Sequence, residues 1–218
     1  MKKYLEYLVC LVCLVGLACL VSCSEEEQEY DPYYNWPARN AAWYEQIADS
    51  ARKNADGKWL MLKSLQQSQS YNSGSVTDSI CVHIISQDAT LANPVSPKWN
   101  DTIRISYRGW LMPTTYKVND DNEQLVDSVM QEVFDQSYYG PFDPEKALPR
   151  LSAVSLFVDG FHTALQYMVA GDNWLVYIPY QLAYGTTAHG TIPGYSTLLF
   201  HIHMAAVYPS GSGVPDWQ

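Results

Sequence analysis

Basic residues are scarce in this chain of 218 residues, which carries 13 Lys and Arg against 23 Asp and Glu, a formal net charge of −10. A protein that binds nucleic acid needs a basic surface, because it must neutralise phosphates and release their counterions. The sequence therefore argues against nucleic acid as a partner. Charged residues make up only 17% of the chain and aromatic residues make up 13%, which is typical of a globular protein rather than a disordered one.

Cysteine is also scarce, and its placement argues against an internal disulfide. Three of the five cysteines, Cys10, Cys13 and Cys19, lie within one N-terminal apolar run, and Cys23 ends that run. Cys81 is the only cysteine in the rest of the sequence, where it has no cysteine to pair with. We expect Cys81 to be a small buried hydrophobic residue rather than a nucleophile.

The motifs of common hydrolytic and phosphate-binding sites are missing. The sequence has no GxSxG, no HExxH and no P-loop lysine, and no pair of carboxylates stands out for acid–base work. The loop YGTTAHGTIPG, residues 184–194, has no basic neighbour and does not open a predicted helix, which argues against phosphate binding. A Ser–His–Asp trio is likewise not evident from the spacing of these residues.

A pair of histidines is the one feature that suggests a metal. His201 and His203 are two residues apart in an apolar run, so on a strand they share one face, and His189 lies upstream. A zinc site needs three or four ligands, and no cysteine pair or carboxylate cluster accompanies the pair. We expect no metal and no cofactor, and we interpret the pair as a half-exposed face of a strand.

The N-terminus has the pattern of an export signal. A short basic segment, MKK, precedes an apolar run from Leu8 to Val21, which is shorter than the ~20 residues of a membrane-spanning helix. An uncleaved membrane anchor is the alternative. The run ends in LVSC, which resembles the lipobox of bacterial lipoproteins. This resemblance implies a signal peptide over residues 1–22, a lipid on Cys23, and a cell-envelope lipoprotein that is held in the outer membrane, on its periplasmic or its surface face.

The segment after Cys23 differs in composition from both of its neighbours. Residues 23–34 contain five acidic side chains close together, at positions 25, 26, 27, 29 and 31, and predict a solvated tether. An acidic stretch at this place resembles a surface-export signal, and an ordinary spacer is the alternative. Residues 35–75 predict a helical extension, with Asn35 as the N-cap and Pro37 in the first turn. Its apolar stripe is predicted to consist of Trp36, Trp43, Ile47 and Ala51. KWLMLKSL, residues 58–65, predicts a strand after this helix.

From residue 76 to residue 208 the pattern is mainly that of strands. Strands are predicted over SICVHIIS (79–86), DTIRISYRGWL (101–111), VSLFV (154–158), NWLVYIPY (173–180) and STLLFHIHMAAV (196–207). DGFHTALQYMVAGD (159–172) predicts a short helix, PTTYKVNDDNEQ (113–124) a polar loop, and LVDSVMQEVFDQS (125–137) fits a helix or a strand. Several strands with one short helix predict an α+β domain with an antiparallel sheet, followed by a loose tail over residues 209–218.

Four stretches within residues 76–208 carry a resemblance to one family. ISYRGWL, VFDQSY, FVDGFHTALQYMVAGDNWLVYIPYQLAYG and IPGYSTLLFHIHM resemble, in this order, the motifs of the FKBP-type peptidyl-prolyl cis-trans isomerases. The resemblance implies an antiparallel sheet curled over one short helix. It also implies an isomerase of X-Pro bonds in exported or envelope proteins, with proline-containing polypeptides as its clients and tacrolimus-like macrolides as ligands of the pocket.

The same resemblance implies a set of site residues. The residues that match the catalytic positions are Tyr107, Phe134, Asp135, Tyr184 and Phe200, and those that match substrate-binding positions are Val158, Phe161, His189 and Ile192. In the family's pattern the Tyr184 hydroxyl donates to the ligand. We further expect backbone N–H groups near Val158 and Ile192 to hold the chain around the proline, and Asp135 to orient the ring of Tyr107 without acting as a base.

Two departures from the family's pattern leave a second function open. Tyr107 and Phe134 are 134 − 107 = 27 residues apart, which is longer than in compact members and makes residues 108–133 an insert beside the pocket. A pocket phenylalanine upstream of the helix is not evident, with Leu151 or Val154 as candidates. The alternative is a catalytically weak FKBP-fold chaperone, or a surface lipoprotein that binds glycans or peptides. A cavity covered by the insert favours this alternative, and an open cavity favours the enzyme.

Overall fold

The computed structural model describes residues 31–67, 75–88, 90–119 and 125–217, and Pro32–Gln218 form one compact unit. The predicted signal peptide, the predicted lipidation site at Cys23 and most of the predicted acidic tether lie outside the described residues. Within the described ranges, no helix has both the length and the hydropathy that crossing a membrane requires.

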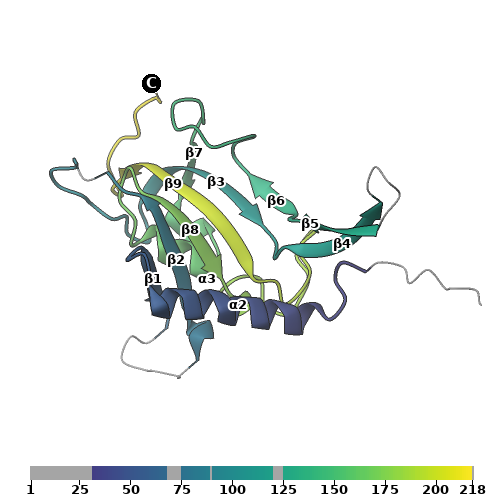
Figure 1. Ribbon diagram of the computed structural model, residues 1–218. Coiled ribbons are helices and arrows are strands. Elements are labelled where there is room, and N and C mark those ends of the chain that lie inside the picture. The colour runs from purple at the N-terminus through teal and green to yellow at the C-terminus, as the bar shows by residue number, and fades with distance from the viewer. Residues whose placement is uncertain (1–30, 68–74, 89, 120–124, 218) are drawn as a thin grey trace, which may run out of the picture. The chain divides into compact units, whose positions relative to one another are not determined.

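One antiparallel sheet organises the described part of the chain, as the alternation of the sequence predicts (Figure 1). Its strands are β1 (Trp59–Lys63), β2 (Ser79–Ser86), β3 (Thr102–Trp110), β6 (Val133–Gln136), β7 (Arg150–Ala153), β8 (Asn173–Ile178) and β9 (Leu198–Tyr208). They lie in the order β1-β2-β8-β9-β3-β6, and β7 pairs with the other half of the β3 edge that β6 occupies. The long central pair β3 and β9 places Gly109 opposite Phe200, which brings residues far apart in the sequence together.

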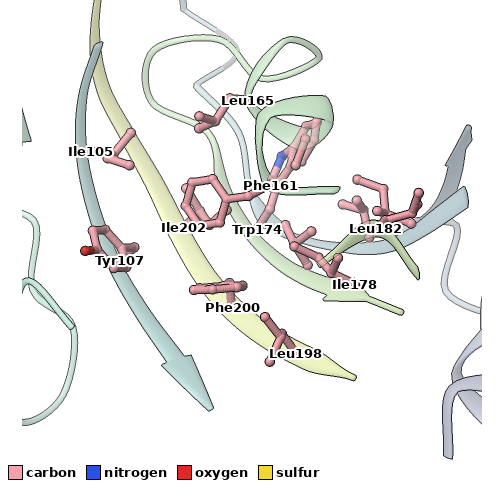
Figure 2. Packing of buried hydrophobic residues seen from close by; sticks show 14 of the residues in the cluster. Ile105, Tyr107, Phe161, Leu165, Trp174, Ile178, Leu182, Leu198, Phe200 and Ile202 are labelled. Carbon is pink, nitrogen blue, oxygen red and sulfur yellow. The ribbon is translucent and has the colours of Figure 1, made fainter. Parts of the chain in front are cut away.

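The short helix α3 (Asp159–Leu165) covers one face of this sheet, which confirms the predicted curled arrangement (Figure 1). Phe161 and Leu165 project from α3 into the core, where Ile105 of β3 and Ile202 of β9 are fully buried (Figure 2). Gly160 allows the close approach, since a Cβ on it would lie 2.3 Å from the Ile178 side chain on β8. Any residue larger than glycine at position 160 would hold α3 further from the sheet.

The N-terminal extension supplies a second helix, α2 (Trp36–Lys53), in agreement with the sequence. Asn35 is the N-cap residue, as predicted, but its backbone is left-handed, with φ +49°, and its side chain makes no capping hydrogen bond. The Trp36 N–H donates to the carbonyl oxygen of Tyr33 instead, at 3.0 Å. Of the predicted stripe, Trp36 and Ala51 are buried and Trp43 and Ile47 are only partly buried. The other buried residues of α2 are Asn40, Tyr44 and Ala48.

The insert contains a hairpin where the sequence indicated a polar loop. The strands β4 (Thr114–Asn119) and β5 (Leu125–Met130) pair only with each other, as a separate two-stranded sheet. The loop prediction over residues 113–124 is therefore wrong for β4, and the ambiguous segment after it divides into β5 and β6. A two-stranded sheet apart from the main core imposes no regular alternation of apolar residues, so the pattern gave no strand signal.

The strand predicted over residues 154–158 is also misplaced. Val154–Leu156 form a 3₁₀ helix, and the strand β7 lies just before it. Ala153 is the last residue of β7 and pairs with Thr102, the first residue of β3, so the ladder cannot continue. The chain turns there toward α3, and the apolar run of this segment serves the core and the pocket instead of a strand.

The two histidines of β9 point away from the core side of the strand, as their alternation with Phe200 predicts. The predicted half-exposed face is wrong for His201, which is only 6% exposed because the loop between β6 and β7 covers it. The Tyr138 hydroxyl lies 2.6 Å from His201 Nδ1, and the ring of Phe142 lies against both His201 and His203. The described residues contain no cluster of three or more groups that could hold a metal ion.

The buried His201 predicts a pH dependence of stability. Burial first, then the nearby His203 and Arg108, lower the pKa of His201 from 6.5 to about 4. The unfolded chain therefore takes up a proton between these pH values that the folded chain does not, so the stabilisation is complete above about pH 6.5 and decreases toward pH 4. We expect the wild-type protein to lose about 2 kcal/mol more of its unfolding free energy than His201→Gln between about pH 7 and pH 4.5. Urea unfolding at both pH values measures this difference, and equal losses in the two proteins would contradict the prediction.

Candidate active site

An open cavity of about 630 Å³ lies between α3, the ends of β3, β6 and β9, and the loop that precedes β9. Its volume is in the range of small-molecule and peptide pockets. All nine site residues expected from the sequence line it: Tyr107, Phe134, Asp135, Val158, Phe161, Tyr184, His189, Ile192 and Phe200. The cavity is also lined by Leu156, Phe157, Gly190 and Thr191, which the sequence did not single out.

Aromatic rings make up the floor of the cavity. The ring of Phe200 on β9 meets Phe161 of α3 edge-on, with centroids 4.8 Å apart, and meets Phe134 of β6 in the same way at 5.3 Å. Tyr107 of β3 stands 6.0 Å from Phe161, and Figure 2 shows these two rings and Phe200 converging from three elements. Edge-to-face packing of this kind is favourable and leaves each ring few alternative positions.

Gly109 makes this ring arrangement possible, and the sequence did not single it out. It lies on β3 directly opposite Phe200. A Cβ at this position would be 2.6 Å from ring atoms of both Phe134 and Phe200. The absence of a side chain therefore lets two rings rest against the backbone of the strand. Only the register of β3 on β9 reveals this requirement, because a glycine in a strand can equally mark a bulge or a bend.

A hydrogen-bonded group forms the polar side of the cavity. The Tyr107 hydroxyl donates to Asp135 Oδ2 at 2.8 Å, and Arg150 Nη1 donates to the Tyr107 oxygen at 3.0 Å. Burial and the bond to Asp135 raise the pKa of Tyr107 to about 12, so its hydroxyl remains a donor at neutral pH. The expected contact between Asp135 and Tyr107 is present. The contact of Arg150 with Tyr107 was not predicted, because the sequence indicated a strand over residues 154–158 and not over β7, which begins at Arg150.

Phe157, just before α3, is an aromatic residue of the cavity that the sequence did not single out. It stacks on Phe161, with centroids 4.4 Å apart and ring planes 14° from parallel, and it lines the cavity. The two candidates named for this role are wrong, because Leu151 is about half exposed on β7 and Val154 is fully buried, and neither lines the cavity. Phe157 stood within the run predicted as a strand, which concealed its position.

The loop from Ala183 to Thr197, here called the flap, forms the upper wall. The Tyr195 N–H donates to the Gly185 carbonyl oxygen at 2.9 Å and closes the base of the loop. Within it, Tyr184 stacks on His189 with centroids 4.2 Å apart and ring planes 5° from parallel. Burial and the nearby Asp135 raise the pKa of Tyr184, so its hydroxyl keeps its proton. That hydroxyl makes no hydrogen bond to another described residue, which leaves it available to a ligand.

The two backbone donors expected to hold a ligand differ in their availability. The N–H of Ile192 donates to the His189 carbonyl oxygen at 3.0 Å, and the His189 N–H donates back to Ile192 at 2.9 Å, so Ile192 offers no spare donor. The tip of the flap is a tight turn that uses the amide of Ile192 for its own hydrogen bond. The Val158 N–H has no acceptor among the described residues, since Val158 stands just before the first turn of α3.

The described part of the insert leaves the cavity open. None of the residues that line the cavity belongs to the described part of residues 108–133. The lining contains no Ser, Cys or Lys that could act as a nucleophile, and its one carboxyl group is bonded to Tyr107. The arrangement is suited to enclosing an apolar group and orienting the chain on either side of it, rather than to bond cleavage.

The close packing at Gly109 predicts a specific effect of adding one methyl group. We expect Gly109→Ala to displace the rings of Phe134 and Phe200 and to lower the free energy of unfolding by about 1–3 kcal/mol, as overpacking does elsewhere. Gly213→Ala is the control, because a Cβ there would meet no atom within 4 Å. Chemical denaturation of both variants measures the effect. Equal stability of Gly109→Ala and the wild-type protein would contradict the packing described above.

Comparison with known proteins places these features in a family. The chain is 39% identical over 70 residues to a macrophage infectivity potentiator of Trypanosoma cruzi, covering 32% of this chain and 36% of that protein. It is 34% identical over 113 residues to the outer membrane protein MIP of Legionella longbeachae, covering 51% of this chain and 38% of that protein. The chain thus spans well under half the length of these relatives.

The fold is also found among solved structures. FkpA from Escherichia coli superposes with a TM-score of 0.50 at 18% identity, over 96% of this chain and 72% of that one. At this identity the similarity concerns the fold alone. The family model of the FKBP-type peptidyl-prolyl cis-trans isomerases matches residues 93–205, more than half of the sequence, and these residues include every predicted cavity residue. The chain therefore belongs to the FKBP-type peptidyl-prolyl cis-trans isomerase family.

Proposed function

We propose that the protein is a peptidyl-prolyl cis-trans isomerase that acts on X-Pro bonds of exported or envelope polypeptides. The observation that carries the proposal is the open aromatic cavity, on which all nine family-matched residues meet. A proline ring is apolar and compact, and the floor formed by Phe134, Phe161 and Phe200 offers it an enclosed surface. Membership of the family supports the same activity.

The rate enhancement follows from desolvation rather than from covalent chemistry. Rotation about an X-Pro bond is slow, with a barrier of about 20 kcal/mol, because it breaks amide resonance. The planar amide is more polar than the twisted transition state, and water therefore stabilises the planar form more. An aromatic cavity that excludes water removes this preference and lowers the barrier. This mechanism needs no nucleophile, in keeping with the lining of the cavity.

Polar groups at the rim would orient the substrate chain. The Val158 N–H and the Tyr184 hydroxyl, both without partners among the described residues, are placed to donate to carbonyl oxygens beside the proline. Tyr107 is held by Asp135 and Arg150 and so keeps its ring in the cavity wall. Asp135 acts here as an acceptor that fixes a ring, and no proton transfer is required of it.

The open cavity also separates this proposal from the alternative of a chaperone or glycan-binding lipoprotein. That alternative depended on an insert that covers the pocket. The described part of residues 108–133 contributes nothing to the lining, and β4 and β5 pair with each other instead. The observation favours the enzyme, with tacrolimus-like macrolides as ligands of the same cavity.

A refolding assay limited by proline isomerisation tests the activity. We expect the domain to accelerate refolding, and Tyr184→Ala and Phe134→Ala each to reduce kcat/KM by about tenfold or more, because each removes a wall of the cavity. Tyr139→Ala is the matched control, since Tyr139 is 84% exposed and outside the cavity. Tacrolimus at micromolar concentration is expected to raise the Tm of the wild-type protein. No acceleration by the wild-type domain would refute the proposal.

We infer that the protein is anchored in the cell envelope through a lipid on Cys23. The support is the LVSC motif at the end of the N-terminal apolar run, together with the acidic tether that follows. A relative from Legionella longbeachae carries the name outer membrane protein MIP, which agrees with an envelope location. The tether would keep the isomerase away from the lipid surface, within reach of unfolded chains.

Replacement of one residue tests the anchor. We expect Cys23→Ser to abolish incorporation of labelled palmitate and to release the protein from the membrane fraction, because the thiol is the only attachment point for the lipid in this motif. Cys19→Ser, in the same apolar run, is the control and should leave labelling unchanged. Protease treatment of intact cells then reports whether the lipid holds the protein on the outer face. Labelling of Cys23→Ser at the wild-type level would contradict the inference.

A further inference from the structure

The flap is fastened at its base to the helix α2, which lies far earlier in the chain. Trp36 Nε1 donates to Ser196 Oγ at 2.9 Å, and that hydroxyl in turn donates to the carbonyl oxygen of Pro193 at 2.7 Å. Asn40 lies one helical turn further along α2, and its Oδ1 accepts from the Thr197 N–H at 2.8 Å. These contacts join α2 to the segment that runs directly into the cavity wall at Ile192.

These contacts are buried, so only one arrangement of the flap base on α2 satisfies all of their hydrogen bonds. Trp36 is 4% exposed and Ser196 is 3% exposed, while Asn40 and Thr197 are essentially inaccessible. A buried donor or acceptor that loses its partner has no water to replace it, so a displaced flap base leaves unpaired groups on both sides. Asn40 is itself oriented by a bond from its Nδ2 to the Trp36 carbonyl oxygen at 2.9 Å. The flap base therefore has one favourable position on α2.

The residues just before α2 also contact the segment that leads into β6. The ring of Tyr33, just before the helix, packs edge-on against Trp36 with centroids 5.1 Å apart. The Tyr33 hydroxyl donates to Glu132 Oε2 at 2.7 Å, one residue before β6. Phe134 and Asp135 follow on β6 and line the cavity. One end of α2 is thus bonded to the segments that lead into two walls of the cavity.

We propose that Trp36 and Asn40 are positioning residues of the isomerase, which hold the flap against the cavity through Ser196 and Thr197. The proposal rests on the proposed function for its catalytic consequence, but the attachment itself can be tested separately. Both residues lie outside the 93–205 range that the family model matches. The N-terminal extension is accordingly a part of the active site's support, and it lies between the site and the acidic tether in the sequence.

The bonds to α2 are expected to affect the position of the flap and not the packing of the aromatic rings in the cavity floor. Without the Trp36–Ser196 bond, the hydroxyl that donates to the Pro193 carbonyl oxygen is no longer held in place. The flap then keeps the hydrogen bonds of the loop itself and the Asn40–Thr197 bond, but it loses its link to α2 at Ser196. Substrate binding depends on the flap wall, whereas the rings of the floor are held by packing on one another. A loosened flap is expected to raise KM more than it lowers kcat.

Hydrogen exchange measured by mass spectrometry tests the attachment directly. In Ser196→Ala and Trp36→Phe we expect amides of residues 185–197 to exchange about tenfold faster than in the wild-type protein. Amides of β3 and β9 should keep their protection. In the refolding assay, both variants are expected to show a higher KM with kcat changed by less than about twofold, an effect that a loss of global stability alone does not produce.

Tyr44→Phe is the matched control on the same helix. It removes a buried hydroxyl that donates to the Ser79 carbonyl oxygen at 2.6 Å, about one helical turn beyond Asn40 and two beyond Trp36. We expect it to lower the Tm without faster exchange in the flap or a change in KM. Flap exchange at the wild-type rate in Ser196→Ala would overturn the proposal, as would equal flap acceleration in Tyr44→Phe. If the wild-type protein has no isomerase activity, the proposed function fails, and the exchange rates still decide whether α2 holds the flap.

Discussion

The edge-to-face contact between Phe161 and Phe200 is the interaction on which the rest of the domain depends. It joins α3 to the central strand β9, and it exists because Gly160 lets the helix approach Ile178 on β8. Large aromatic side chains contribute much of the apolar burial of a small core. This contact therefore fixes the distance of α3 from the sheet and the orientation of the helix on it. The cavity begins where the same two rings are no longer covered by other side chains. The rings of Phe161 and Phe200 therefore both stabilise the fold and form part of the cavity on which the proposed function depends.

The face of the sheet that points away from α3 is covered by a loop instead of a helix. His201 and His203 would leave a polar face on β9, but the loop between β6 and β7 covers them with Tyr138 and Phe142. The Tyr138 hydroxyl supplies the hydrogen bond that the buried His201 requires. The histidine pair that suggests a metal site in the sequence is thus covered by aromatic rings, and His201 is hydrogen-bonded to Tyr138. The consequence is a histidine that resists protonation, because burial lowers its pKa to about 4.

Long-range polar contacts connect the extension to the site. The core alone does not fix the flap, since a loop of small and polar residues has few apolar groups to bury. The buried bonds from α2 to Ser196 and Thr197 provide this constraint, because buried polar groups tolerate only the geometry that satisfies them. An isomerase that works by excluding water needs such a constraint, since a mobile wall would admit water. The extension is therefore joined to the catalytic part through buried hydrogen bonds as well as apolar packing.

The sequence alone determined the antiparallel sheet, the short helix and nine of the residues that line the cavity, because alternation and the family motifs are local patterns. It misplaced β4 and β7, since neither strand carries a regular alternation of its own. Tertiary structure decided the roles of Gly109, Phe157 and Arg150, each of which depends on what lies opposite it in another element. It also decided that Asn40 faces the flap, as nothing near position 40 in the sequence indicates a partner at position 197. Contacts between distant segments follow from register and packing, and these are properties of the whole fold.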